Sequence, residues 1–185
     1  MNDIIKEISS NAARPLLNIS QTGAKHIQLF EIDCALLEDY NNINILHSER
    51  YKSLFDDLQK MTGPCLYYFE ITSNHIPNEI INSIKTYSLS EYPKATPAIK
   101  KQPPIDSKIL YVGEVKRHMY GRLIQHLGFF KTSATQGLQL FYWARTIPLS
   151  LKLTVMEFEP EMENLMEVLE NELARKLKPI LGKHK

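Results

Sequence analysis

Three side chains spaced four residues apart are the first feature of this sequence that could do chemistry. His118, Arg122 and His126 belong to the stretch "ILYVGEVKRHMYGRLIQH", residues 109–126, in which an apolar run ends at a glycine. If residues 116–127 form a helix, this spacing stacks two imidazoles and a guanidinium along one face. The central arginine would repel a metal cation, so the column suits an anion such as phosphate better than zinc. The alternative is the polar stripe of an ordinary amphipathic helix.

One carboxylate and two phenols could complete such a site. Glu170 falls on the apolar stripe of a predicted C-terminal helix, where an unpaired carboxylate would be costly. An adjacent cation or metal ion would hold it ionised. The alternative is a carboxylate that bends into solvent, and spacing alone favours it. Tyr67 and Tyr111 lie in predicted interior strands, where most tyrosines are core residues whose hydroxyl reaches the surface.

The elements that would position these residues follow from hydrophobic periodicity and from turn residues. Strands are expected at 26–37, 64–71, 108–113 and 151–159. Helices are expected near 3–9 and at 48–63, 77–86, 116–127, 138–145 and 160–179. This order of strands and helices predicts an α+β fold.

The chain divides into an N-terminal extension, residues 1–62, and a main domain, residues 63–185. Within the main domain, residues 72–108 look like an insertion between two strands. Four prolines between positions 93 and 104 disfavour regular structure in its second half.

Composition narrows the classes of function. The 185 residues carry a formal net charge of +1, so a nucleic-acid site would have to come from local clusters. Residues 107–131 and 171–185 each hold five Lys or Arg against one Glu, which favours a polyanionic partner. Cys34 and Cys65 are isolated, which fits a reducing compartment rather than structural zinc. Without a signal-peptide pattern or a long apolar run, we expect a cytoplasmic protein that does not enter the membrane.

Short motifs within residues 64–182 resemble those of the GIY-YIG nuclease family. The tripeptides "CLY" (65–67) and "YVG" (111–113) stand where the two family tripeptides would be. Arg122 follows Tyr111 by eleven residues, as the helix arginine of the family does, and His126 matches a histidine of some of its restriction endonucleases. Glu170 precedes Pro179 by nine residues, as in the closing helix of the family.

This resemblance implies a small three-stranded, mainly antiparallel sheet flanked by helices. It also implies a divalent-metal-dependent endonuclease. The substrate would be double-stranded DNA, and the enzyme could act as a homodimer. Glu170 would hold one Mg²⁺ or Mn²⁺, and Arg122 would bind the phosphate. Tyr67 would help to activate water and Tyr111 to orient it, with His126 as partner or substitute base. The residues expected to contact nucleic acid are Lys116, Arg117, His118 and Lys183.

Two other functions fit the same sequence. Cys65 replaces a glycine of the first tripeptide, Gly182 stands where the family often has an asparagine, and the two tyrosines are 44 positions apart. A weakened GIY-YIG-like module that binds nucleic acid or a protein partner is therefore the main alternative. In a third possible function, residues 1–60 and the insertion bind other proteins and no nucleic acid is involved.

Overall fold

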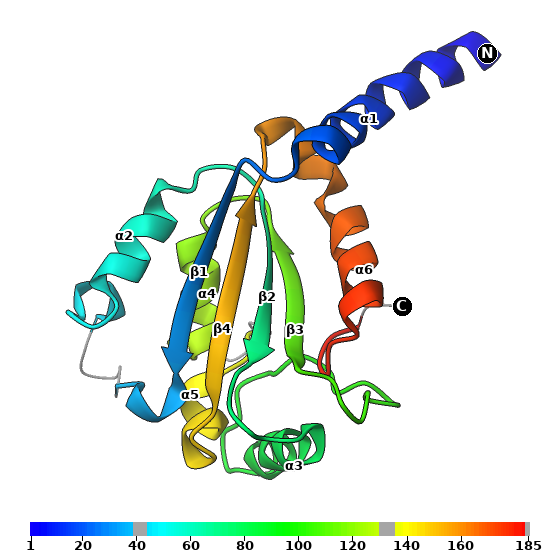
Figure 1. Ribbon diagram of the computed structural model, residues 1–185. Helices are drawn as coiled ribbons and strands as arrows, with labels where there is room; N and C mark the ends of the chain where they lie inside the picture. The colour runs from blue at the N-terminus through cyan, green and yellow to red at the C-terminus, as the bar shows by residue number, and fades with distance from the viewer. Residues whose placement is uncertain (39–43, 130–135, 184–185) are drawn as a thin grey trace.

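A four-stranded antiparallel sheet organises the computed structural model, which describes residues 1–38, 44–129 and 136–183 (Figure 1). The strands are β1 (His26–Asp33), β2 (Cys65–Ile71), β3 (Ile109–Val115) and β4 (Ser150–Glu157), in the spatial order β1-β4-β2-β3. The predicted α+β class is confirmed. The sheet has one strand more than the three that we expected, because β1 of the N-terminal extension pairs with β4 along its whole length.

Six α-helices accompany the sheet within the described residues: α1 (Asn2–Thr22), α2 (Lys52–Lys60), α3 (Pro77–Ser88), α4 (Met119–Leu127), α5 (Leu140–Trp143) and α6 (Met166–Leu177). Short 3-10 turns occupy Cys34–Leu36, Ile45–His47, Ala144–Thr146 and Pro160–Leu165. In that part of the chain, no helix combines the length and the apolar character needed to span a membrane.

One face of the sheet is covered by helices, and the other is covered in part, since Ile27 and Leu29 of β1 stay exposed. The main core lies between one face and helices α2, α3, α4 and α5, and it includes Tyr67 and Phe69 of β2. On the other face, Leu66 of β2 packs with Met162 of the 3-10 turn Pro160–Leu165 and with Met166 at the start of α6. α6 also runs beside β3, at the edge of the sheet (Figure 1).

The N-terminal helix is much longer than the predicted helix near 3–9. α1 continues through Pro15 to Thr22, and its first half extends away from the body of the protein (Figure 1). A proline inside a helix removes one backbone hydrogen bond. Leu16 and Ile19, which follow the proline, pack beside a second hydrophobic cluster that contains Leu66, Met162 and Met166. These tertiary contacts stabilise the part of the helix after Pro15.

The helices expected at 48–63, 116–127, 138–145 and 160–179 all begin later than predicted, and two of these differences affect the site. α4 starts at Met119, and His118 precedes it in a left-handed backbone conformation (φ 59°). His118 is therefore outside the helix, and the predicted column of three residues is wrong at its first member. The expected helix 160–179 begins as the 3-10 turn Pro160–Leu165 and becomes α-helical at Met166.

The insertion leaves the pairing of β2 with β3 intact. Tyr67 lies opposite Gly113 and Phe69 opposite Tyr111 in antiparallel register. The inserted residues form α3 and then an irregular segment, which pairs with the C-terminus through an isolated bridge between Ile99 and Leu181.

Candidate active site

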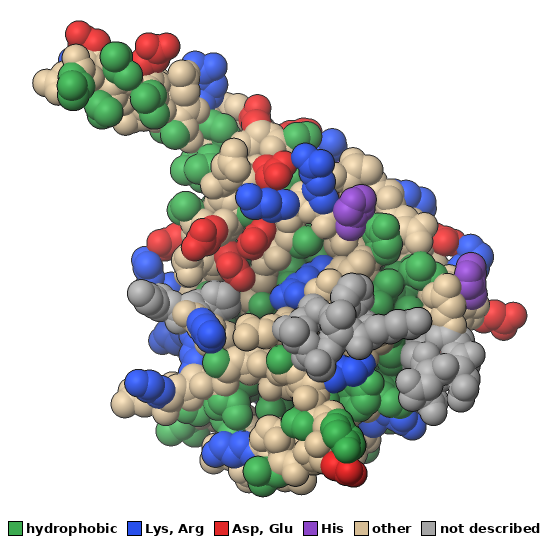
Figure 2. Space-filling view, turned by 180° about the vertical axis from the view of Figure 1, so that it is seen from behind, with side chains coloured by type: hydrophobic (Ala, Val, Ile, Leu, Met, Phe, Trp, Pro, Cys, Tyr) green, Lys and Arg blue, Asp and Glu red, His purple; other side chains and the backbone are tan. Residues whose placement is uncertain are grey.

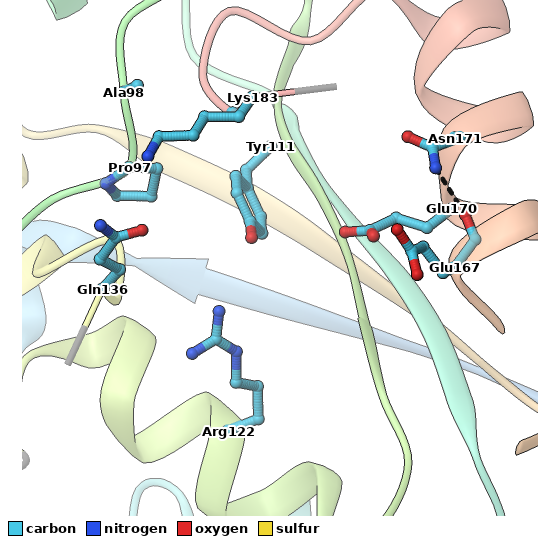
Figure 3. Close-up of a pocket in the computed structure, with 10 residues that line it drawn as sticks. Pro97, Ala98, Tyr111, Arg122, Gln136, Glu167, Glu170, Asn171 and Lys183 are labelled. Carbon is cyan, nitrogen blue, oxygen red and sulfur yellow. Dashed lines mark hydrogen bonds between the residues drawn. The ribbon is translucent and has the colours of Figure 1, made fainter. Parts of the chain in front are cut away.

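A pocket of about 280 Å³ lies where α4, α6, β3, the insertion and the C-terminal segment meet (Figure 3). Its lining residues are Pro97, Ala98, Tyr111, Arg122, Gln136, Glu167, Glu170, Asn171, Gly182 and Lys183. Four residues predicted from sequence thus share one pocket: Tyr111, Arg122, Glu170 and Lys183. Cations and carboxylates lie on different walls, with Tyr111 between Arg122 and Glu170 (Figure 3).

Arg122 is held from behind by two hydrogen bonds. Its Nε donates to Tyr67 Oη (3.0 Å), and its Nη1 donates to Gln125 Oε1 (2.8 Å). The guanidinium points from α4 into the pocket (Figure 3). Since a guanidinium is planar and permanently charged, anchoring two of its nitrogens fixes the direction in which it offers positive charge.

Tyr67 lies behind Arg122 and is completely buried. It is not among the residues that line the pocket. Burial raises the pKa of its phenol far above the ordinary value of 10, although the Arg122 charge opposes the shift. The glycine of "YVG" makes room for this phenol, because a Cβ on Gly113 would lie 2.5 Å from Tyr67 Oη.

His126 is also completely buried and is not among the residues that line the pocket. Its Nδ1 accepts the backbone N–H of Leu138 (3.1 Å), so the proton of the neutral imidazole resides on Nε2. This Nε2 lies 2.8 Å from Tyr67 Oη and donates to it. Burial, aided by the Arg122 charge, lowers the pKa of His126 well below 6.5.

In this arrangement His126 cannot take a proton from Tyr67, because the facing nitrogen already carries one. The prediction that His126 acts as a base is therefore wrong. The prediction that all three residues of the column face an anion such as phosphate is also wrong. Of the three residues in the column, Arg122 alone lines the pocket. Tyr67 and His126 instead form a buried support that holds the Arg122 guanidinium.

Tyr111 is the phenol that reaches the pocket surface. It comes from β3, and its ring centroid lies 6.3 Å from that of Tyr67 and 5.2 Å from that of His126. Burial raises its pKa, and the Arg122 charge counteracts part of this effect. At neutral pH Tyr111 is a neutral hydroxyl that can both donate and accept a hydrogen bond.

Glu170 faces the pocket from α6, close to Glu167 of the same helix and Glu114 of β3. Its pKa is raised to about 7, first by burial and then by the charges of Glu114 and Glu167. Glu114 Oε2 is buried and has no hydrogen-bond partner among the described residues. Closely placed carboxylate oxygens suit a hard cation such as Mg²⁺, which keeps several water ligands. Glu167 and Glu170 on the pocket wall could each supply a carboxylate ligand, although no group of three or more His, Cys, Asp or Glu within the described ranges could hold a metal ion.

The remaining predicted contacts lie outside the pocket. Lys116, Arg117 and His118 are exposed on the turn between β3 and α4. Arg117 Nη2 donates to Glu163 Oε2 (3.4 Å) at the start of the C-terminal element. Lys116 and Arg117 contribute positive charge beside the site rather than within it.

Sequence reasoning missed several residues of the site. Glu167 could have been found, because it lies three residues before Glu170 and therefore shares its helix face. Pro97 and Ala98 come from the middle of the insertion, and no local pattern marks them as a pocket wall.

Comparisons with protein-family models, with curated proteins and with solved structures found no match for this chain.

Proposed function

We propose that this protein is a divalent-metal-dependent endonuclease that hydrolyses phosphodiester bonds in DNA. One observation carries the proposal. An anchored guanidinium, Arg122, and a clustered carboxylate, Glu170, face one pocket with the Tyr111 hydroxyl between them. Hydrolysis of a phosphodiester needs such groups, because its transition state accumulates negative charge on phosphorus oxygens and on the leaving oxygen.

Each pocket residue has a distinct role in this proposal. The Arg122 guanidinium binds nonbridging phosphate oxygens, for which its planar fork is suited. Glu170 would hold Mg²⁺ or Mn²⁺, which when bound supplies positive charge for the phosphate and the leaving oxygen. The Tyr111 hydroxyl orients the attacking water. Tyr67 and His126 act behind Arg122 as positioning residues.

The basic residues around the pocket favour DNA as the polyanion. Lys116 and Arg117 lie on the turn before α4, and Lys183 lies at the pocket itself. Contacts of lysine and arginine with phosphates give an affinity that falls steeply with salt. The resemblance also predicts a double-stranded substrate. Cleavage of both strands at one place requires two active sites, which a homodimer would supply.

A plasmid assay tests the function. Supercoiled plasmid is incubated with the purified protein in Mg²⁺ or Mn²⁺, and with EDTA as the metal-free reaction. We expect nicked or linear DNA with the metal, and a loss of at least about 100-fold in rate for Glu170→Gln. Glu172→Gln is the matched control, because Glu172 is exposed on the same helix and pairs with Arg175. Cleavage by Glu170→Gln at the wild-type rate would contradict the assignment.

A second candidate is a module that binds DNA without cleaving it. The burial of Tyr67 favours this function, because it removes one phenol from the pocket surface and keeps its proton in place. Salt-dependent binding of a duplex, with no metal-dependent cleavage by the wild-type protein, would establish this alternative.

A further inference from the structure

The C-terminal segment is built into the wall of the pocket by backbone hydrogen bonds on both of its sides. On one side, the N–H groups of Ile180 and Leu181 donate to Ile109 O (2.9 Å) and Leu110 O (3.0 Å) of β3. On the other side, Gly182 N–H donates to Ala98 O (2.8 Å), and Lys100 N–H donates to Ile180 O (3.3 Å). Residues 97–100 of the insertion therefore form a strap, and residues 180–182 are held between this strap and β3.

The last turn of this segment directs one side chain into the pocket. Gly182 has a backbone φ of 117°, a region that favours glycine. The next residue is Lys183, which lines the pocket, and its side chain extends over the cavity beside Pro97 (Figure 3). Glycine at position 182 thus has a physical role, since it allows the chain to turn while the hydrogen bonds to β3 and to the strap are kept.

We propose that Lys183 is a catalytic residue that binds the scissile phosphate together with Arg122, and that the strap 97–100 holds it in place. This inference rests on the proposed function, and it specifies which groups meet the phosphate. Arg122 approaches from α4 and Lys183 from the C-terminal segment, whereas Glu170 lies on the wall formed by α6 (Figure 3). Two nonbridging oxygens can then each meet one cation, and the side toward Glu170 stays available for the metal ion. The long insertion is accordingly part of the site.

Binding of inorganic phosphate measures this role without requiring cleavage. Isothermal titration is performed on the wild-type chain, Lys183→Gln, Lys183→Arg and the control Lys176→Gln, which removes an exposed charge of α6 that does not line the pocket. We expect affinity to fall about tenfold or more in Lys183→Gln and to be largely retained in Lys183→Arg and Lys176→Gln. Equal affinity of the wild type and Lys183→Gln, or absence of phosphate binding by the wild type, would overturn the inference.

Single-turnover cleavage then separates this inference from the proposed function. If the wild type cleaves DNA, Lys183→Gln should slow the cleavage step at saturating enzyme about tenfold or more, and Lys183→Arg should restore most of the rate. Cleavage by Lys183→Gln at the wild-type rate refutes the role of Lys183 and leaves the nuclease assignment standing. Phosphate binding that depends on Lys183, with no cleavage by the wild type, refutes the nuclease assignment and supports Lys183 as a phosphate ligand.

The strap has a matched pair of variants at one position. Lys100→Pro removes the N–H that donates to Ile180, whereas Lys100→Gln removes the side-chain charge and keeps that N–H. We expect Lys100→Pro to weaken phosphate binding about as much as Lys183→Gln, and Lys100→Gln to bind like the wild type. If Lys100→Pro melts like the wild type and binds phosphate with unchanged affinity, the strap does not position Lys183.

Discussion

At the scale of single residues, Glu170 combines its proposed role in metal binding with a cost to stability. Its folded-state pKa of about 7 lies above the ordinary 4.5, because burial and neighbouring carboxylates penalise the charge. The native state therefore keeps a proton that the unfolded state releases between these values, and stability falls as pH rises from about 4.5 to 7. After allowance for partial exposure, we expect a loss of about 1–2 kcal/mol from this group.

Glu170→Gln should remove that pH dependence. In urea unfolding at pH 4.5 and pH 8, the variant should match the wild type at the lower pH and exceed its stability at the higher pH. Mg²⁺ added at pH 8 should raise the melting temperature of the wild type but not of the variant, because binding to the native state stabilises it. An unchanged difference between the two proteins across this range would contradict the assigned electrostatic environment.

His126 has the opposite dependence on pH. Burial lowers its pKa in the native state, whereas the unfolded chain protonates it near 6.5. Below pH 6.5 the unfolded state binds more protons, so stability falls by at most about 1.4 kcal/mol per pH unit because of this group. The charged and titratable groups around it are Arg122, Tyr67 and Tyr111.

His126→Leu tests this behaviour. The variant should be less stable than the wild type at pH 7.5, because the Leu138 N–H and Tyr67 Oη lose their partner. Its disadvantage should shrink between pH 7.5 and pH 5, measured by urea unfolding at both values. A constant disadvantage would mean that the imidazole is not held neutral in the native protein.

At the scale of elements, the register of β2 against β3 determines where the site can form. Gly113 lies opposite Tyr67, and the Tyr67 phenol occupies the space that a side chain at 113 would need. We expect Gly113→Ala to cost about 1–3 kcal/mol, as overpacking in a core does, and to displace the support of Arg122. Gly121→Ala is the control, because nothing lies within 4 Å of its added Cβ in α4.

This control should act in the opposite direction. An alanine inside a helix is favoured over glycine by about 0.5–1 kcal/mol, so Gly121→Ala should stabilise the protein. Thermal unfolding of both variants measures the difference. Equal effects of the two substitutions would show that the contact between Gly113 and Tyr67 does not constrain the fold.

The elements also show what could be predicted from the sequence. Apolar runs located β2 and β3 within a few residues. Helical spacing was a poorer guide, because it grouped Arg122 with His118 and His126 and by itself favoured a Glu170 that bends into solvent. The burial of His126 could not be predicted, since its partner is the backbone N–H of Leu138, in the irregular segment before α5. The strap was equally hidden, because its pairing with residues 180–182 uses long-range backbone hydrogen bonds that leave no local pattern.

At the scale of the whole molecule, the N-terminal extension makes two different kinds of contact. β1 pairs with β4 over all of its residues and belongs to the sheet. In contrast, α1 contacts the body near its C-terminal end, where Leu16 and Ile19 pack beside the cluster of Leu66 and Met162. The first half of α1 carries the exposed side chains of Ile4, Ile5 and Ile8, and Figure 2 shows apolar groups along this projecting helix.

Two deletions test this division of α1. Removing residues 2–14 should change the free energy of unfolding by less than about 1 kcal/mol, because these residues bury no side chain. Removing residues 2–22 also strips Leu16 and Ile19 from the second cluster, and should cost about 2–4 kcal/mol from the lost apolar burial. Chemical denaturation of both shortened chains measures the difference. A large loss on the shorter deletion would contradict this division of α1, because residues 2–14 bury no side chain.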